Sequence, residues 1–273
     1  MAYFTNELEN VPVKIPKDYL LEQGATFKYT SENVAGKGYQ HEPSELTLEG
    51  CNCTVLSCGP GCTCIKAYGP NYDDKGHLLT ITSNSSLPYI KPIFECNGSC
   101  RCGDTCINRV VQNGIAIQLE AFMTENKGLG LRALQNIGKG QFVCEYAGEI
   151  LGHSEAKSRT DVKTIDDMNY LLILKEHAGK ETKITFIDPT YIGNVGRFIN
   201  HSCNPNLEVF PVRVNNEIPR AALFAKYDIS SREELCYSYH GDLEPTQNIQ
   251  NSKPCYCGSD KCRKYLPHNL LAF

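Results

Sequence analysis

Residues 51–64 read CNCTVLSCGPGCTC, so that five cysteines fall within fourteen positions. A second group, CNGSCRCGDTC at residues 96–106, adds four more. Nine thiols cannot all pair as disulfides, and the stretch 1–24 lacks the apolar core of a secretory signal peptide. In a reducing compartment, cysteines at such spacings favour metal binding.

Closely spaced thiolates favour Zn²⁺, which prefers four ligands in a tetrahedron. Nine sulfurs fill two such sites and leave one sulfur unused, whereas three sites use every sulfur if three of them each bridge two ions. The second arrangement is preferred, so the spacing predicts a Zn₃Cys₉ cluster without indicating which sulfurs bridge. The expected ligands are Cys51, Cys53, Cys58, Cys62, Cys64, Cys96, Cys100, Cys102 and Cys106.

The segment CYCGSDKC at residues 255–262 supplies three thiols, Cys255, Cys257 and Cys262. A tetrahedral zinc site needs one more ligand. Cys203, within RFINHSCNPN, is the expected fourth donor, and a buried free thiol is the alternative for it. The sequence therefore predicts four zinc ions in all. The remaining two cysteines are expected to be buried thiols that bind no metal: Cys144 and Cys236.

Short segments rich in aliphatic and aromatic residues predict a mostly β protein with a few short helices. One helix is expected over SEAKSRTDVKT, residues 154–164, with Ser154 as its N-cap. The polar segment 67–94 is rich in Asn, Ser, Gly and Pro and is expected to be a loop, and the residues before about Glu45 a short packed extension. The expected strands are FVCEYAG (142–148), NYLLILK (169–175), RAALFAK (220–226) and ELCYSY (234–239).

The composition supplies a core but few functional clues. Apolar residues make up 41% of the chain and the formal net charge is −4. Thirteen zinc-bound thiolates and four Zn²⁺ ions would lower this charge to about −9. An acidic surface favours a basic partner, such as a histone tail, and argues against tight binding to nucleic acid phosphates. No apolar run approaches the length of a membrane span.

Four further segments accompany the cysteines: KGLGLR, EYAGE, GRFINHSCNPN and EELCYSYHG. Together with the flanking cysteine groups, they resemble the SET-domain lysine methyltransferases that carry pre-SET and post-SET zinc modules. Among these, the chain most resembles members whose methyltransferase half is fused to a transposase. The resemblance implies a SET-domain β-fold in which NHSC and ELCYSY form a pseudoknot-like crossing. It also implies an N-terminal extension (1–47), a pre-SET cluster module (48–115), a SET domain (116–241) and a post-SET segment (251–267).

The same resemblance implies methyl transfer from S-adenosylmethionine (SAM) to a lysine amine. A free lysine has a pKa of about 10.4, so deprotonation at pH 7 costs about 4.6 kcal/mol, which a desolvated site beside a sulfonium lowers. Tyr239 is the expected main catalytic residue and Tyr146 lines the same channel. A phenol with a pKa near 10 is a poor base, so both are expected to orient the amine while water removes the proton. Tyr237 occupies the family's Phe/Tyr switch position, which favours mono- and dimethyl products.

Cofactor contacts are expected, by resemblance, from three segments of the chain, with Arg197 supporting the third. Tyr265 is expected to pack on the adenine or to close the substrate channel. Three residues depart from the family pattern: Leu129 stands where Trp is usual, Ser238 where Asp is usual, and Cys236 where a small polar residue is usual. The full set of expected cofactor residues is Lys127, Gly128, Leu129, Gly130, Tyr170, Arg197, Asn200, His201 and Tyr265.

The resemblance implies a nuclear, chromosome-associated monomer that methylates histone H3 at its ninth or thirty-sixth lysine, as a tail peptide or within a nucleosome. Two alternatives remain open. The departures at Leu129 and Ser238 favour a catalytically silent chromatin-binding module that keeps its zinc scaffold. A methyltransferase for a non-histone protein is the other alternative.

Overall fold

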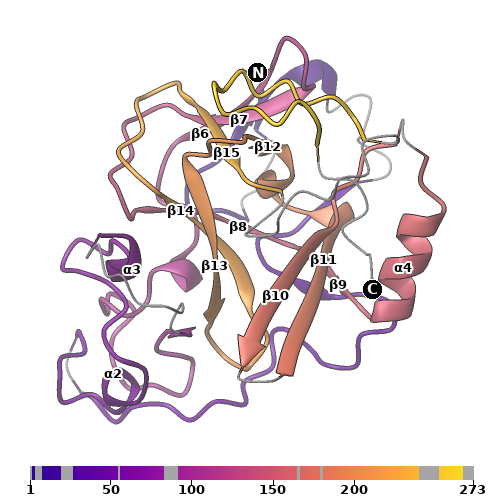
Figure 1. Ribbon diagram of the computed structural model, residues 1–273. Helices are drawn as coiled ribbons and strands as arrows, with labels where there is room; N and C mark the ends of the chain where they lie inside the picture. Colours follow the sequence, from indigo (N-terminus) through magenta and orange to yellow (C-terminus); the bar gives the residue numbers. More distant parts are fainter. Residues whose placement is uncertain are drawn as a thin grey trace.

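The computed structural model describes residues 2–3, 8–19, 27–54, 56–82, 92–164, 167–178, 181–239 and 252–266. Three sheets of short strands dominate these residues (Figure 1). The prediction of a mostly β protein is confirmed. No helix among the described residues is long and apolar enough to cross a membrane.

The largest sheet joins N-terminal strands to strands from the middle and the later part of the chain. Its strand order is β1-β2-β6-β7-β15-β12. The strand β12 pairs in parallel with β15, so that Asn200 lies opposite Cys236 and His201 opposite Tyr237. The NHSC and ELCYSY segments thereby become neighbours, as expected. The strands are β1 (Ala2–Tyr3), β2 (Lys14–Ile15), β6 (Leu119–Met123), β7 (Leu129–Ala133), β15 (Glu234–Tyr237) and β12 (Asn200–His201).

A second sheet has the order β10-β11-β9-β4, with β3 paired to β11. The N-terminal segment supplies β3 and β4 to this sheet and β2 to the first one. Val13 and Ile15 are fully buried in the main core, so this segment forms part of the fold. The strands are β10 (Leu172–Ala178), β11 (Glu181–Gly193), β9 (Gly148–Leu151), β4 (Val34–Ala35) and β3 (Lys28–Tyr29).

The third sheet, β5-β13-β14-β8, connects the cysteine-rich module to the centre of the molecule. Strand β5 pairs with β13, and the buried Glu95, directly after β5, links this sheet to the rest of the cysteine-rich module. Its carboxylate accepts hydrogen bonds from the Tyr72 hydroxyl (2.7 Å) and from the backbone N–H groups of Val110 and Val111 (2.9 and 2.7 Å). The strands are β5 (Ile93–Phe94), β13 (Leu207–Arg213), β14 (Arg220–Ala225) and β8 (Phe142–Tyr146).

The helices are short. The predicted helix exists as α4 (His153–Asp161), but the prediction of Ser154 as N-cap is wrong, because Gly152 caps the helix. A Cβ atom at Gly152 would lie 2.2 Å from the carbonyl oxygen of Gly38, so this close backbone contact sets the start of the helix. The expected loop 67–94 is only partly a loop, and residues 83–91 lie outside the described ranges. Segment 67–94 contains the end of α2 (Thr63–Tyr68) and all of α3 (Leu79–Thr82). Elsewhere in the described residues, two 3₁₀ turns form: η1 (Val111–Asn113) and η2 (Val195–Phe198).

Candidate active site and metal centres

The nine cysteines of the first two groups gather into one cluster beside α2. The Sγ atoms of Cys51 and Cys58 are 3.7 Å apart, as are those of Cys58 and Cys96. The sulfurs form three overlapping sets of four, and within each set the four Sγ atoms lie within 4.8 Å of one another. Cys51 belongs to all three sets, and Cys58 and Cys96 each belong to two. The sets are Cys51, Cys53, Cys58 and Cys62; Cys51, Cys64, Cys96 and Cys100; and Cys51, Cys58, Cys96 and Cys102.

Hydrogen-bond donors surround these sulfurs. The Sγ atom of Cys100 accepts from the backbone N–H groups of Cys51 and Asn97, both at 3.2 Å. The Sγ atom of Cys106, which none of the three sets includes, accepts from the N–H of Cys58 at 3.3 Å. The Arg109 guanidinium lies 3.6 Å from the Sγ atom of Cys102. These donors stabilise negative charge on sulfur, so this donor set fits thiolates that bind zinc.

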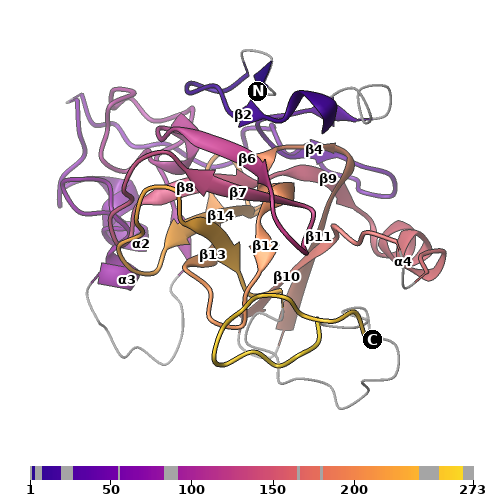
Figure 2. The same ribbon diagram turned by 90° about the horizontal axis from the view of Figure 1, so that it is seen from above.

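A second cysteine cluster forms where the C-terminal segment meets the segment after β12. The ligand atoms of its four members lie within 4.8 Å of one another, and the Sγ atoms of Cys203 and Cys255 are 3.9 Å apart. The expected pairing of Cys203 with the C-terminal group is therefore present. Figures 1 and 2 place the C-terminal segment, in yellow, well away from α2 and α3. The members are Cys203, Cys255, Cys257 and Cys262.

Both remaining cysteines are buried, as expected: Cys144 is fully buried and Cys236 is 9% exposed. Neither belongs to a set of potential metal ligands within the described residues. Because each lies in a core strand, β8 or β15, packing accounts for their position.

The three predicted catalytic tyrosines lie together, although they come from distant parts of the sequence. Tyr146 ends β8, Tyr237 ends β15, and Tyr239 follows two residues later. The ring centroids of Tyr146 and Tyr237 are 6.0 Å apart, and those of Tyr237 and Tyr239 are 4.8 Å apart. Pairing of β12 with β15 brings His201 to the same place, with its ring 5.3 Å from that of Tyr239.

Backbone carbonyls fix two of the three hydroxyl groups. The Tyr239 hydroxyl donates to the carbonyl of Ile199 (2.9 Å), and the Tyr146 hydroxyl donates to that of Tyr170 (2.5 Å). The proton of each hydroxyl is therefore engaged, and the oxygen retains a lone pair that can accept a hydrogen bond. Burial raises the pKa of Tyr146, Tyr237 and Tyr239 well above 10. All three phenols are neutral at pH 7, which suits orientation of an amine better than proton abstraction.

The predicted cofactor residues of the first and third segments form one polar group. The Glu234 carboxylate binds the Lys127 ammonium (2.6 Å) and the Asn200 amide (3.0 Å). The same amide donates to the carbonyl of Leu129 at 3.0 Å. A Cβ atom at Gly130 would lie 2.8–3.3 Å from side-chain atoms of Thr124, Glu234 and Asn200, so a larger residue would force these side chains to move. Gly128 adopts a φ of +70°, the left-handed conformation that glycine favours.

Arg197 lies between two aromatic rings. Its guanidinium carbon is 4.3 Å from the ring centroids of both Phe27 and Tyr170. The side chain is buried, yet its Nε and Nη1 atoms have no hydrogen-bond partner within the described ranges. A buried, unpaired guanidinium is costly in the absence of an anion. An anionic group of a ligand, such as the carboxylate of SAM, would satisfy these atoms.

Tyr265 lies on the C-terminal segment, where it forms a β-bridge with Pro254. It is 40% exposed, unlike the three catalytic tyrosines. Tyr265 therefore lies at the surface, on the segment that carries the second cysteine cluster.

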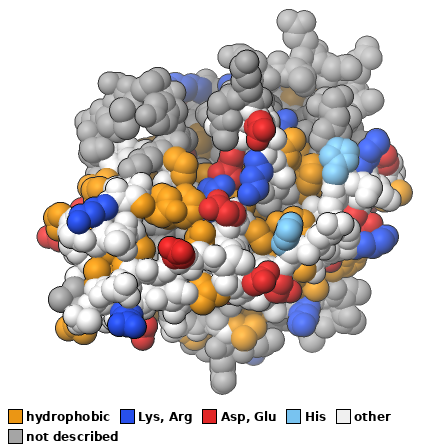
Figure 3. All heavy atoms as spheres, turned by 90° about the horizontal axis from the view of Figure 1, so that it is seen from below, with side chains coloured by type: hydrophobic (Ala, Val, Ile, Leu, Met, Phe, Trp, Pro, Cys, Tyr) orange, Lys and Arg blue, Asp and Glu red, His pale blue; other side chains and the backbone are white. Residues whose placement is uncertain are grey.

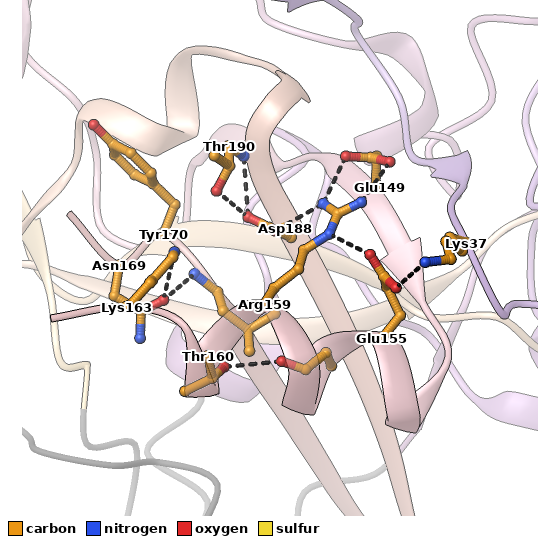
Figure 4. A network of polar contacts seen from close by, with 12 residues as sticks. Lys37, Glu149, Glu155, Arg159, Thr160, Lys163, Asn169, Tyr170, Asp188 and Thr190 are labelled. Carbon is orange, nitrogen blue, oxygen red and sulfur yellow. Dashed lines mark hydrogen bonds and ion pairs between the residues drawn. The ribbon is translucent and has the colours of Figure 1, made fainter. Parts of the chain in front are cut away.

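Helix α4 is fastened next to Tyr170 by a network of ion pairs (Figure 4). Arg159 binds Glu149 (2.8 Å), Asp188 (2.9 Å) and Glu155 (3.0 Å). Lys163, just beyond the helix, donates to the side chain of Asn169 at 3.2 Å. The network thus ties α4 to β9 and β11 and reaches the residue that precedes Tyr170.

Three residues of this site were not identified from the sequence. Glu234 joins Lys127 to Asn200, and Phe27 covers Arg197 from the N-terminal segment. Ile199 contributes only its backbone carbonyl. A carboxylate at the start of an apolar strand was a usable signal for Glu234. No local pattern points to Phe27 or Ile199, because their partners are set by the tertiary fold.

Two protein families match the sequence: a Pre-SET motif over residues 5–109 and a SET domain over residues 128–240. The fold, the tyrosine site and the two cysteine clusters agree with this pair. The chain belongs to the SET-domain family of histone-lysine N-methyltransferases.

Individual relatives support this assignment. The chain is 45% identical to rat "Histone-lysine N-methyltransferase SETMAR" over 96% of this chain and 86% of that protein. The crystal structure of the methyltransferase domain of human SETMAR is 43% identical, covers 98% of both chains and has a TM-score of 0.83. KRYPTONITE in complex with mCHH DNA, an H3(1–15) peptide and SAH is 30% identical, with a TM-score of 0.70 over 96% of this chain and 52% of that one.

Proposed function

We propose that this protein transfers methyl groups from SAM to a lysine of the histone H3 tail, at the ninth or thirty-sixth position, and stops mainly at mono- or dimethyl-lysine. The observation that carries the proposal is the group of three buried, neutral tyrosines. Two of their hydroxyls already donate to backbone carbonyls and so offer lone pairs to a ligand. KRYPTONITE, with its H3 peptide and SAH, supports the choice of substrate and cofactor.

SAM, when bound, supplies an electrophilic methyl group on a sulfonium. The residues of the chain position the acceptor. The Tyr239 and Tyr146 hydroxyls accept N–H hydrogen bonds from the amine and aim its lone pair, which lowers the entropic part of the barrier. Desolvation among the rings lowers the pKa of the amine. Because the phenols themselves have raised pKa values, water takes the proton.

Three groups of residues would hold the cofactor. Gly128, where an added Cβ atom would meet nothing within 4 Å, leaves room for the close backbone approach of a ligand, and Gly130 lets Asn200 lie close by. Arg197, with two unpaired nitrogens next to Tyr170, would bind the carboxylate. The expected contributions of Lys127, Leu129, His201 and Tyr265 remain part of this proposal. Leu129 stands where the family usually has Trp and therefore has no aromatic ring to stack on the cofactor. Its contribution would be a backbone contact.

We assign four Zn²⁺ ions, three in the nine-cysteine cluster and one in the four-cysteine cluster. Three sulfurs must bridge if nine thiolates serve three tetrahedral ions. Cys51, Cys58 and Cys96 each belong to more than one of the overlapping sets, so these are the sulfurs that would be available to two ions. Cys106, whose Sγ lies beside Cys58, then completes the third site with Cys102.

We further propose that the protein acts in the nucleus, on chromosomes, as a monomer. The chain is divided into an extension (1–47), a pre-SET module (48–115), a SET domain (116–241) and a post-SET segment (251–267) in this proposal. On the face in Figure 3, acidic and basic side chains are interspersed with apolar ones. The negative net charge of the chain supports a basic peptide as partner rather than nucleic acid.

The test is intact-mass analysis of a histone H3 tail peptide after incubation with zinc-loaded protein and SAM. Peptides with arginine in place of the ninth or the thirty-sixth lysine identify the acceptor. Tyr239→Phe removes the hydroxyl and is expected to lower the rate about 100-fold. Tyr227→Phe, at a 41% exposed position, is the matched control and retains the wild-type rate.

Two outcomes would favour the alternatives. If the wild-type protein binds the H3 peptide but adds no methyl group, the chain is a chromatin-binding module. If it methylates other proteins in a peptide array but not H3, its substrate is not a histone. Equal rates for Tyr239→Phe and wild type would contradict the assigned role of Tyr239.

A further inference from the structure

His201 lies between the four-cysteine cluster and the tyrosine site. Its side chain is almost completely buried, with 3% exposure. The Nδ1 atom accepts a hydrogen bond from the backbone N–H of Tyr239 at 3.1 Å. The Nε2 atom lies 3.3 Å from the Sγ atom of Cys203. One imidazole ring therefore connects a potential zinc ligand to the backbone of the main catalytic candidate.

These two contacts determine where the proton of the ring lies. Since Nδ1 accepts from an N–H group, it carries no proton. The proton of the neutral ring is then on Nε2 and points at the Cys203 sulfur. A thiolate that binds zinc is a good acceptor for such a donor, and donors of this type orient metal ligands and raise metal affinity. The backbone N–H of Arg263 approaches the same sulfur at 3.4 Å.

Because of its position in β12, His201 contacts Tyr239 through its side chain, whereas the backbone of this strand pairs with that of Tyr237. Residues 200 and 201 form β12, which is paired with β15 on its other side. The backbone N–H of Ser202 donates to the carbonyl of Tyr237 at 3.1 Å. The strand pairing therefore holds Tyr237, whereas the His201 ring joins Cys203 to the backbone of Tyr239.

We propose that His201 is a positioning residue that couples zinc occupancy at the four-cysteine site to the placement of Tyr239. This role goes beyond the cofactor-side contact proposed above, and it rests on the proposed function only in its effect on the methylation rate. A bound zinc ion would fix the Cys203 sulfur, which accepts a hydrogen bond from Nε2–H of His201. The Nδ1 atom of the same ring accepts a hydrogen bond from the backbone N–H of Tyr239. Loss of the zinc ion loosens Tyr239 through this chain of contacts.

Two variants separate the two hydrogen bonds. In His201→Asn the side-chain oxygen replaces Nδ1 and still accepts from Tyr239, but nothing reaches Cys203. In His201→Gln the amide nitrogen replaces Nε2 and still donates to Cys203, but the acceptor for Tyr239 is lost. His153→Asn, at an exposed position in α4, is the matched control.

The first measurement is release of Zn²⁺ from the full-length protein to a chelator. Removal of a hydrogen-bond donor to a metal ligand typically lowers metal affinity 10–100-fold. We expect His201→Asn to release one of its zinc ions at least 10-fold faster than wild type, and His201→Gln and His153→Asn to release it at the wild-type rate. Wild-type release from His201→Asn would overturn the proposal.

The second measurement is amide hydrogen exchange at Tyr239, with the four-cysteine site loaded and after removal of its zinc. In wild type, we expect removal to lower the protection of this amide at least 10-fold. In His201→Asn the protection should be the same in both states, because the acceptor no longer responds to Cys203. An equal drop in both proteins would show that the coupling bypasses His201. Neither measurement uses methylation, so an inactive wild-type protein would contradict the proposed function alone.

Discussion

Replacement of Arg159 by methionine should destabilise the protein far more than replacement of any exposed cation of the same helix. The guanidinium of Arg159 binds three carboxylates at 2.8–3.0 Å. One of these, Asp188, has a side chain that is only 2% exposed. In Arg159→Met this carboxylate keeps its hydrogen bonds from Thr190 but loses its counter-ion.

Removing one partner of a buried ion pair typically costs 3–5 kcal/mol, because it leaves an uncompensated charge. For a protein of this size, this loss lowers the thermal midpoint by about 10 °C. Lys157→Met is the control within the same helix. Its ion pair with Asp161 has side-chain exposures of 54% and 59%. An exposed pair of this kind contributes about 0.5 kcal/mol or less.

Thermal unfolding of zinc-saturated protein measures both variants, and a double variant tests the mechanism. If the cost arises from the unpaired Asp188, adding Asp188→Asn to Arg159→Met should recover part of the lost stability. The reasoning is wrong if Arg159→Met and Lys157→Met differ by less than about 1 kcal/mol. It is also wrong if Asp188→Asn lowers the free energy of unfolding by the same amount in Arg159→Met as it does in the wild-type protein.

Three other predictions concern the site and its surroundings. Tyr237→Phe should shift the product toward trimethyl-lysine, and an unchanged product distribution in mass spectrometry would refute the switch role. Cys257→Ser should reduce the zinc content by one ion and abolish methyl transfer while the nine-cysteine cluster stays folded; full activity would contradict the assignment of the four-cysteine site. Burial raises the pKa of Glu145 to about 8, only partly offset by Arg220. Because its unfolded pKa is about 4.3, folding favours the protonated form, so this group makes stability fall by about 2 kcal/mol as the pH rises from 6 to 8. Glu145→Gln should flatten this dependence in zinc-saturated urea titrations, and parallel curves would count against it.

Local patterns predicted the elements that carry their own signal. The four expected strands appear as β8, β10, β14 and β15, since each is an apolar segment with turn or charged residues at its ends. The cysteine spacing predicted two clusters, and both are present. The placement of Tyr146 beside Tyr237 came from family resemblance, because no periodicity relates residues so far apart in the sequence.

Elements that depend on tertiary contacts were missed. The longest strand, β11 (Glu181–Gly193), begins with charged residues and contains Pro189. A proline normally argues against a strand, but here it lies at a break in the register between β11 and β9. The helix cap at Gly152 was missed because its cause is the backbone of Gly38, which no local rule reports.

The sheet order has a consequence for how the polypeptide is made. Strand β4 can pair only after β9, more than a hundred residues later, has been synthesised, and β3 only after the end of β11. Such a high contact order implies slow folding, with little native structure until most of the chain has left the ribosome. During this interval the cysteines that the folded protein buries are exposed. Production of active enzyme should therefore depend on the supply of zinc and reductant during synthesis, more than on conditions applied afterwards.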